Sequence, residues 1–192
     1  MNKAVFLDRD GVLIEDVHLL TQQDQIRILP GVPEALSRLK SVGFQLIVVS
    51  NQTVVARGLS TEAQVLAINR HIAWLLINEK APSLDSVYIC PHHPSATLSA
   101  YRQICDCRKP RPGMFLQAAN ERNIDLRKSF AVGDRITDII AGSRAGCTTV
   151  MVQTGRHEAP LIESADPIDF TVQPDWVCSD LLAAADWILK QQ

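Results

Sequence analysis

The sequence predicts an α/β fold in which helices cover both faces of a doubly wound parallel sheet. Apolar runs of strand length recur along the chain, and segments with the apolar periodicity of a helix lie between them. The runs are continuous and do not alternate apolar with polar residues, which is typical of strands that are buried on both faces. Strands that alternate with helices in this way favour successive βαβ units and a parallel sheet.

The N-terminal part of the chain supplies two of these strands and the helix between them. A first strand is predicted at residues 4–7 (AVFL) and a second at residues 44–50 (FQLIVVS). Residues 31–43 carry leucines on one helical stripe and end at Gly43. Glycine is common directly after a helix, so the helix is predicted to stop there.

The middle of the chain contains the longest predicted helix, over residues 60–80. Its apolar residues recur at helical spacing, and Thr61 with Gln64 fits a capping box, in which each residue satisfies a backbone N–H near the other. The run SVYIC at residues 86–90 follows and predicts the third strand.

The C-terminal half repeats the alternation. Helices are predicted at residues 111–123 and 136–146, and strands at residues 129–133 and 148–154. A last helix is predicted at residues 181–190. Between residue 154 and this last helix the pattern loosens into a stretch rich in proline and acidic residues, HEAPLIESADPIDF (157–170).

Composition indicates one globular domain, residues 1–192. The chain has 46% hydrophobic and 21% charged residues, a formal net charge of −2 and a pI near 6.2. No long basic block is present, which argues against nucleic acid or an anionic membrane as partner. No segment approaches the ~20 apolar residues of a membrane span, and charged residues interrupt the N-terminus too early for a signal peptide. We expect a cytoplasmic monomer.

Polar side chains follow the predicted strands at the ends where parallel sheets bind ligands. They are Asp8, Asp10, Ser50, Asn51, Gln52, Asp134 and Asp138, with Lys109 in a loop ahead of a helix. A single aspartate after a strand is most often a turn former or a helix cap. Several carboxylates at one edge of a sheet repel each other unless a cation is present, so the set predicts a Mg²⁺ site.

Four segments resemble, in order, the motifs of the haloacid dehalogenase superfamily of phosphohydrolases. These segments are DRDG (8–11), VVSNQ (48–52), RKPRPG (108–113) and GDRITD (133–138). Four motifs in the right order and at suitable separations make the resemblance specific. It implies a Rossmann-like fold and a reaction that passes through a phosphorylated aspartate.

The resemblance also implies a role for each matching residue. Asp8 would be the nucleophile, and Asp10 would be the general acid and then the general base. Ser50 would hold the phosphoryl oxygens, and Lys109 would balance the charge between nucleophile and phosphoryl group. Mg²⁺ would be held by Asp8, the backbone carbonyl of Asp10 and Asp134. A clamp of metal, lysine and backbone donors is what the transition state of phosphoryl transfer needs.

A group of cysteines and histidines in the middle of the chain predicts a second metal site. Cys90 and His92 form one short pair, and Cys105 and Cys107 form another. Four such donors in two pairs suit tetrahedral Zn²⁺. His93 is an alternative histidine ligand, and free thiols with loop histidines are the alternative interpretation of the whole group. A disulfide is disfavoured by the reducing compartment and, within the C-x-C pair, by geometry.

The segments CPHHP and CDCRKPRPG, at the ends of this zinc loop (residues 90–107), narrow the resemblance. They are similar to a capless subgroup that contains heptose 1,7-bisphosphate 7-phosphatases and histidinol phosphatases. The subgroup implies a structural zinc, no large cap domain and a small phosphorylated sugar as substrate, within the synthesis of nucleotide-activated heptose. The predicted substrate-binding residues are Asn51, Gln52, Arg57 and Arg108.

Three alternatives stay open from the sequence. Histidinol phosphate is the rival substrate, and a sugar phosphotransferase or mutase is the rival reaction. The third is a non-catalytic zinc module, against which the joint presence of the catalytic residues argues. Thr53, Val54 and Val55 replace the small, glycine-containing part of the subgroup's second motif, which leaves the sugar and its anomer undetermined.

Overall fold

A computed structural model describes residues 1–155, 169 and 171–191. Its centre is a six-stranded sheet with the strand order β3-β2-β1-β4-β5-β6, in which every neighbouring pair is parallel. The strands are β1 (Lys3–Leu7), β2 (Phe44–Asn51), β3 (Ser86–Cys90), β4 (Phe130–Gly133), β5 (Thr148–Val152) and β6 (Trp176–Cys178). The predicted α/β fold with a parallel sheet is confirmed.

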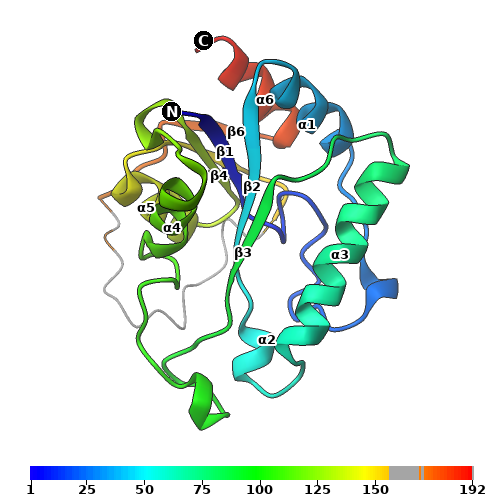
Figure 1. The fold of residues 1–192 in the computed structure, drawn as a ribbon, viewed down its shortest axis with the longest axis vertical. Coiled ribbons are helices and arrows are strands. Elements are labelled where there is room, and N and C mark those ends of the chain that lie inside the picture. Colours follow the sequence, from blue (N-terminus) through cyan, green and yellow to red (C-terminus); the bar gives the residue numbers. More distant parts are fainter. Residues whose placement is uncertain (156–168, 170, 192) are drawn as a thin grey trace.

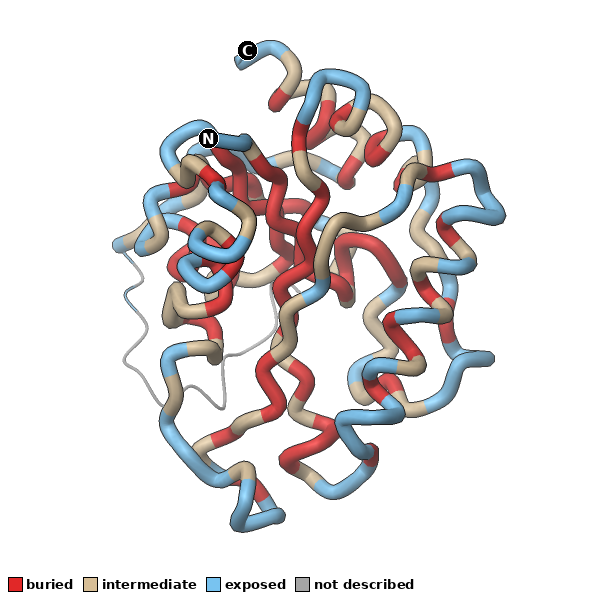
Figure 2. Tube along the Cα trace, viewed as in Figure 1, coloured by how far each residue is buried: buried red, intermediate tan, exposed pale blue. Residues whose placement is uncertain are grey.

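Helices cover both faces of the sheet. They are α1 (Val32–Ser41), α2 (Thr53–Ala56), α3 (Glu62–Asn78), α4 (Gly113–Arg122), α5 (Ile136–Ala145) and α6 (Leu181–Leu189). Figure 1 shows α1, α3 and α6 on one side of the sheet and α4 and α5 on the other. The central strands are buried along their length, whereas exposed residues gather on the outer surfaces of the helices and in loops (Figure 2).

Alternate residues of β1 belong to two different cores. Val5 and Leu7 pack in the cluster that includes α1, α3 and α6, while Ala4 and Phe6 pack in the cluster that includes α4 and α5. The ring of Phe6 lies 4.8 Å from that of Phe115 on α4. Because both faces of the strand are covered, both sets of side chains are apolar, which is why the run is unbroken.

The five helices predicted from the sequence are all present, as α1, α3, α4, α5 and α6. The capping box of α3 forms as predicted: the Thr61 backbone N–H donates to Gln64 Oε1 at 2.8 Å, and the Gln64 N–H donates to Thr61 Oγ1 at 3.2 Å. The short helix α2 was not predicted, since its β-branched residues favour strands. It is held instead by the burial of Val54 and Val55 against Val65 of α3.

The topology determines where a ligand can bind. The chain moves outward from β1 to β2 and β3 on one side, then returns to place β4, β5 and β6 on the other side. The winding direction therefore reverses between β1 and β4. A crevice forms at such a point, beyond the carboxyl ends of the two strands. In the described part of the chain, no helix has the length and apolar character to cross a membrane.

Candidate active site

The carboxyl ends of β1, β2 and β4 bring the predicted catalytic residues together. Asp8 follows β1 and Asp134 follows β4, while Ser50 lies near the end of β2. The Asp8 N–H donates to the carbonyl oxygen of Val132 at 3.0 Å, which ties the end of β1 to β4. Asp8, Ser50, Asp134 and Lys109 are all at least nine-tenths buried, with exposures of 8%, 1%, 1% and 3%.

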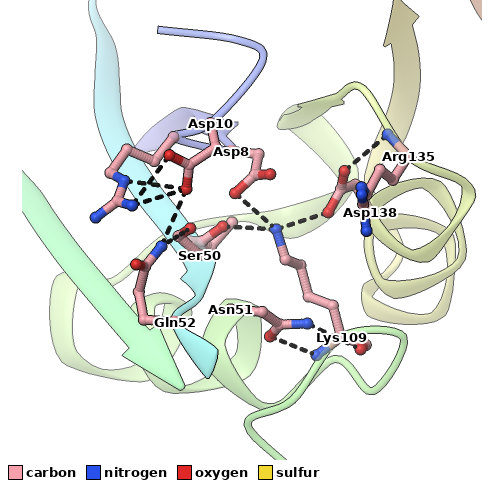
Figure 3. Close-up of polar contacts among 10 residues, drawn as sticks. Asp8, Asp10, Ser50, Asn51, Gln52, Lys109, Arg135 and Asp138 are labelled. Atoms are coloured by element: carbon pink, nitrogen blue, oxygen red, sulfur yellow. Dashed lines mark hydrogen bonds and ion pairs between the residues drawn. The ribbon is translucent and has the colours of Figure 1, made fainter. Parts of the chain in front are cut away.

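Lys109 reaches into this group from the loop before α4. Its Nζ lies 3.0 Å from Asp8 Oδ1 and 2.6 Å from Asp138 Oδ1, and it donates to the carbonyl oxygen of Val49 at 2.8 Å. Figure 3 shows its side chain pointing between Asp8 and Asp138. Burial lowers the pKa of Lys109, but the ion pairs with Asp138 and Asp8 outweigh it and raise the pKa above its ordinary value. The lysine is therefore a fixed positive charge at neutral pH.

Three buried carboxylates lie together beside this lysine. Asp8, Asp134 and Asp138 each offer an oxygen, and these oxygens lie within 4.8 Å of one another. One lysine leaves the group negative, and oxygen donors at this spacing suit a divalent cation such as Mg²⁺. Both Asp138 oxygens are engaged within the protein, one by Lys109 and one by the Arg135 N–H at 3.0 Å. Asp8 and Asp134, which directly follow β1 and β4, are the other two carboxylates of the group.

The backbone passes close to these carboxylates, which requires glycine. Gly11 has a φ of +79°, and a Cβ there would lie 2.7 Å from the Asp134 carboxylate. Only glycine adopts this conformation without strain while leaving room for Asp134. Backbone conformation and packing therefore explain why the DRDG motif ends in glycine.

The Asp10 carboxylate has a separate set of partners. Arg9 donates to it from Nε and NH2, and Gln52 Nε2 donates to Asp10 Oδ2 at 3.1 Å and to Ser50 Oγ at 2.8 Å. Figure 3 shows Asp10 facing Gln52 and Asp8 facing Lys109. Burial raises the pKa of Asp10, and Arg9 only partly offsets this. A carboxyl group with a raised pKa suits proton transfer near neutral pH.

Asn51 makes its side-chain contacts with the protein. Its Oδ1 accepts from the Lys109 backbone N–H at 3.1 Å, and its Nδ2 donates to the Lys109 carbonyl oxygen at 3.1 Å. This pair of hydrogen bonds fastens the Lys109 loop to the end of β2. Arg57 directly follows α2, in the segment after the carboxyl end of β2, and is half-buried.

The cysteine and histidine side chains of the zinc loop converge on one point. The sulfur atom of Cys107 lies 3.1 Å from that of Cys90 and 3.2 Å from that of Cys105, and His92 Nδ1 lies 3.4 Å from Cys107 Sγ. Three thiols and one imidazole gathered in this way are compatible with a tetrahedral zinc site. The hydrogen bond between Cys107 and Cys90 lowers the pKa of Cys107, which favours the thiolate form that metals bind. His93 instead accepts from the backbone N–H of Ser95 at 3.1 Å, so the histidine of the cluster is His92.

The cysteine cluster and the lysine are coupled through a short piece of chain. Cys107 precedes Arg108 and Lys109 directly, and the Arg108 guanidinium donates to the His92 carbonyl oxygen at 3.1 Å. The cluster and the lysine that faces Asp8 are therefore separated by a single residue, Arg108.

Two residues of the site were missed by the sequence analysis. Arg9 is 2% exposed and contacts Asp10, although its position between two aspartates was a visible signal. Asn69, on α3, accepts a hydrogen bond from Arg9 NH1 at 3.1 Å. Its signal was a polar residue on the apolar stripe of a helix.

Comparison with known proteins decides the family. The HAD-hydrolase-like family model matches residues 106–184. The D-glycero-beta-D-manno-heptose-1,7-bisphosphate 7-phosphatase of Escherichia coli O6:H1 is 40% identical over 190 residues, which cover 98% of this chain and 95% of that protein. The chain belongs to this family of HAD-type phosphatases. The Pasteurella multocida protein of the same name is 45% identical over 157 residues, covering 81% of this chain and 84% of that protein.

A solved structure of the same phosphatase family has the same architecture. The D,D-heptose 1,7-bisphosphate phosphatase from B. bronchiseptica, complexed with magnesium and phosphate, superposes with a TM-score of 0.81. It is 33% identical, and the match covers 99% of both chains. The predicted membership of the haloacid dehalogenase superfamily is confirmed, and the chain is a phosphoric monoester hydrolase by family.

Proposed function

We propose that this phosphatase removes the 7-phosphate of D-glycero-β-D-manno-heptose 1,7-bisphosphate through a phosphorylated Asp8. The observation that carries the reaction type is the division of labour between two neighbouring carboxylates. Asp8 faces Lys109 and the acidic cluster, whereas Asp10 faces Arg9 and Gln52. This difference in partners supports Asp8 as the nucleophile and Asp10 as the residue that transfers the proton. The choice of sugar and anomer is supported by the names of the relatives.

In the first half of the reaction, an Asp8 oxygen forms a bond to phosphorus while the bond from phosphorus to the sugar oxygen breaks. Asp10 gives its proton to that departing oxygen. In the second half, Asp10 takes a proton from water, and the water oxygen attacks phosphorus. The bond between Asp8 and phosphorus then breaks, and phosphate leaves with both carboxyl groups returned to their starting state.

The remaining polar residues hold the charge that develops during transfer. Lys109 is protonated and within 3.0 Å of Asp8, so it neutralises the approach of a carboxylate to a phosphate. Asp138 holds Lys109 in place from the other side at 2.6 Å. Ser50, oriented by Gln52, is the hydroxyl that we assign to the phosphoryl oxygens.

We assign the catalytic metal to Asp8, Asp134 and the backbone carbonyl of Asp10. When bound there, Mg²⁺ would offset the negative charge that the carboxylate and the phosphate share. Zinc would be held by Cys90, His92, Cys105 and Cys107 in a structural role, within the single domain of residues 1–192.

The four predicted substrate-binding residues receive two kinds of role. Arg57 and Arg108 are the cations we propose for the distal hydroxyls and the 1-phosphate. We give Asn51 a positioning role in place of the predicted substrate contact, because both of its polar atoms bond to the Lys109 backbone. Gln52 is likewise 3% exposed and bonds to Asp10 and Ser50, so we assign it to orienting these two residues.

The substrate assignment is tested by measuring phosphate release with Mg²⁺ present. We expect the β-anomer of heptose 1,7-bisphosphate to give the highest kcat/KM and heptose 1-phosphate as product. Histidinol phosphate is the second substrate of the screen, and a higher kcat/KM for it would overturn the choice of sugar. Transfer of the phosphoryl group to an added sugar, with no free phosphate, would overturn hydrolysis itself.

Zinc removal is expected to lower both stability and activity. Without metal, three cysteines at 3.1–3.5 Å lose the ion that joins them, and the chain leading to Lys109 loses its anchor. We expect Tm to fall by roughly 10 °C, since a few kcal/mol correspond to that shift for a chain of this size, and phosphate release to fall with it. Differential scanning calorimetry and the phosphate assay, before and after a zinc chelator, measure the two effects.

A pair of serine variants separates zinc loss from the loss of a thiol. Cys107→Ser is expected to reproduce the effect of the chelator. Cys178→Ser makes the same chemical change in β6, outside the cluster, and is expected to keep zinc and activity. Unchanged Tm and activity after complete removal of zinc would rule out the structural role.

A further inference from the structure

A chain of hydrogen bonds connects α3 to the proton-transfer residue Asp10. The Arg9 guanidinium donates three hydrogen bonds to Asp10, from Nε to Oδ2 at 3.1 Å and from NH2 to Oδ1 and Oδ2 at 3.0 and 2.8 Å. Its remaining terminal nitrogen, NH1, donates to Asn69 Oδ1 at 3.1 Å. Arg9 and Asn69 are 2% and 7% exposed, so their bond is shielded from solvent, whereas the Asp10 side chain at the other end is 24% exposed.

Asn69 is out of place as a packing residue. The other buried residues of α3 are Val65, Ile68, Ile72 and Leu76. An amide on such a face costs stability unless it is hydrogen-bonded, and an apolar side chain of similar size would pack there without that cost. The Asn69 Nδ2 atom is buried and has no hydrogen-bond partner among the described residues, so the bond that its oxygen accepts from Arg9 is the contact that uses its polarity.

The bond to Asn69 limits how the guanidinium can turn. The guanidinium is planar, so an acceptor at NH1 and a carboxylate at Nε and NH2 together define its orientation. The Asp10 carboxylate is then held by two nitrogens of the Arg9 guanidinium on one side and by the Gln52 amide on the other. Loss of the acceptor at NH1 would let the guanidinium and the carboxylate move together while remaining paired.

We propose that Asn69 is a positioning residue, which acts through Arg9 to aim the Asp10 carboxylate at the oxygen that leaves phosphorus. The inference rests on the proposed role of Asp10 and extends it to a helix 60 residues further along the chain. Arg9 is the second positioning residue. Neither side chain needs to touch the substrate for this effect. Both act by setting the orientation of the Asp10 carboxyl group, and therefore the direction in which it transfers a proton.

Rapid-mixing kinetics with p-nitrophenyl phosphate test the proposal. Its leaving group is stable as an anion, so formation of phospho-Asp8 hardly needs a proton, whereas hydrolysis of phospho-Asp8 still needs Asp10 as base. For Asn69→Leu we expect a nitrophenolate burst at nearly the wild-type rate, followed by turnover slowed roughly tenfold, a part of what general acid–base catalysis contributes. Phosphoenzyme should accumulate in acid-quenched samples.

Matched variants distinguish positioning from packing. Ile72→Val disturbs the same buried face of α3 without touching Arg9 and is expected to lower Tm while leaving the ratio of burst rate to turnover unchanged. Asn69→Asp keeps an acceptor for Arg9 and is expected to restore much of the turnover. Arg9→Lys retains the charge beside Asp10 but not the fork, so adding Asn69→Leu to it should have no further effect.

The possible results separate this inference from the function beneath it. Equal slowing of burst and turnover in Asn69→Leu, or wild-type kinetics, would overturn the positioning role. Full additivity of Asn69→Leu with Arg9→Lys would also overturn it. If the leucine variant is unstable, Asn69→Ala, which also removes the acceptor for Arg9, takes its place in the cycle. A wild-type enzyme that forms no phospho-Asp8 would instead refute the proposed function.

Discussion

Asp8→Asn is expected to abolish phosphate release while leaving the protein folded. The amide has nearly the shape of the carboxylate but cannot form the bond to phosphorus. In a covalent hydrolase, loss of the nucleophile costs about 10⁶-fold in kcat. The fold should survive because Lys109 keeps Asp138 as its partner at 2.6 Å.

The experiment combines three measurements. Phosphate release gives the activity, thermal unfolding checks the fold, and mass spectrometry of acid-quenched enzyme reports whether the peptide that contains Asp8 is phosphorylated. Asp24→Asn makes the same change at an exposed position and is expected to behave like the wild type. If Asp8→Asn turned over as fast as Asp24→Asn, the nucleophile would have to be another residue.

Lys109→Met is expected to lower stability as well as activity. The substitution leaves Asp8 and Asp138 buried without the cation that lies between them. Removal of one partner from a buried ion pair costs about 3–5 kcal/mol. The loss of a positioned positive charge at the developing transition state should reduce kcat about 10²–10³-fold.

The stability of Lys109→Met should also depend on pH with a defined sign. Burial already raises the pKa of Asp138, and Lys109 is the largest influence that lowers it. Without the lysine, the folded-state pKa lies further above the unfolded value, so the folded protein binds the proton more tightly than the unfolded chain. The free energy of unfolding of the variant should therefore recover as pH falls through the folded-state pKa and decrease as pH rises.

Urea unfolding at several pH values, without Mg²⁺, measures this effect. Lys128→Met is the control, because that side chain is 74% exposed and lies 4.0 Å from Asp125. We expect the control to unfold like the wild type at every pH. A stability deficit of Lys109→Met that stayed constant or grew toward acid pH would contradict the ion-pair explanation.

Much of the fold was predictable because its signals are local. Unbroken apolar runs such as residues 44–50 report burial on both faces, and the pairing of Thr61 with Gln64 reports where α3 begins. The helix α2 was missed because it depends on contacts with a distant segment. Val54 and Val55 favour strands locally, and their burial against α3 overrides that preference.

The approach of Asp8, Ser50 and Asp134 to one another was also implied by the sequence. Each follows or ends a strand, and the carboxyl ends of adjacent parallel strands meet at one edge of the sheet. The motif order and the cysteine spacing indicated the phosphatase family and a metal-binding loop in the same local way. Local sequence patterns were therefore enough to predict the class of fold and the residues at the edge of the sheet where the chemistry is proposed.

The contacts that support those residues could be identified only in the folded protein. It selected His92 over its neighbour His93, turned Asn51 toward the Lys109 backbone, and brought Asn69 of α3 to Arg9. The physical reason is that a buried polar group takes whichever partner the packing of distant segments places within about 3 Å. That distance is a property of the assembled helices and strands, and no pattern of neighbouring residues encodes it.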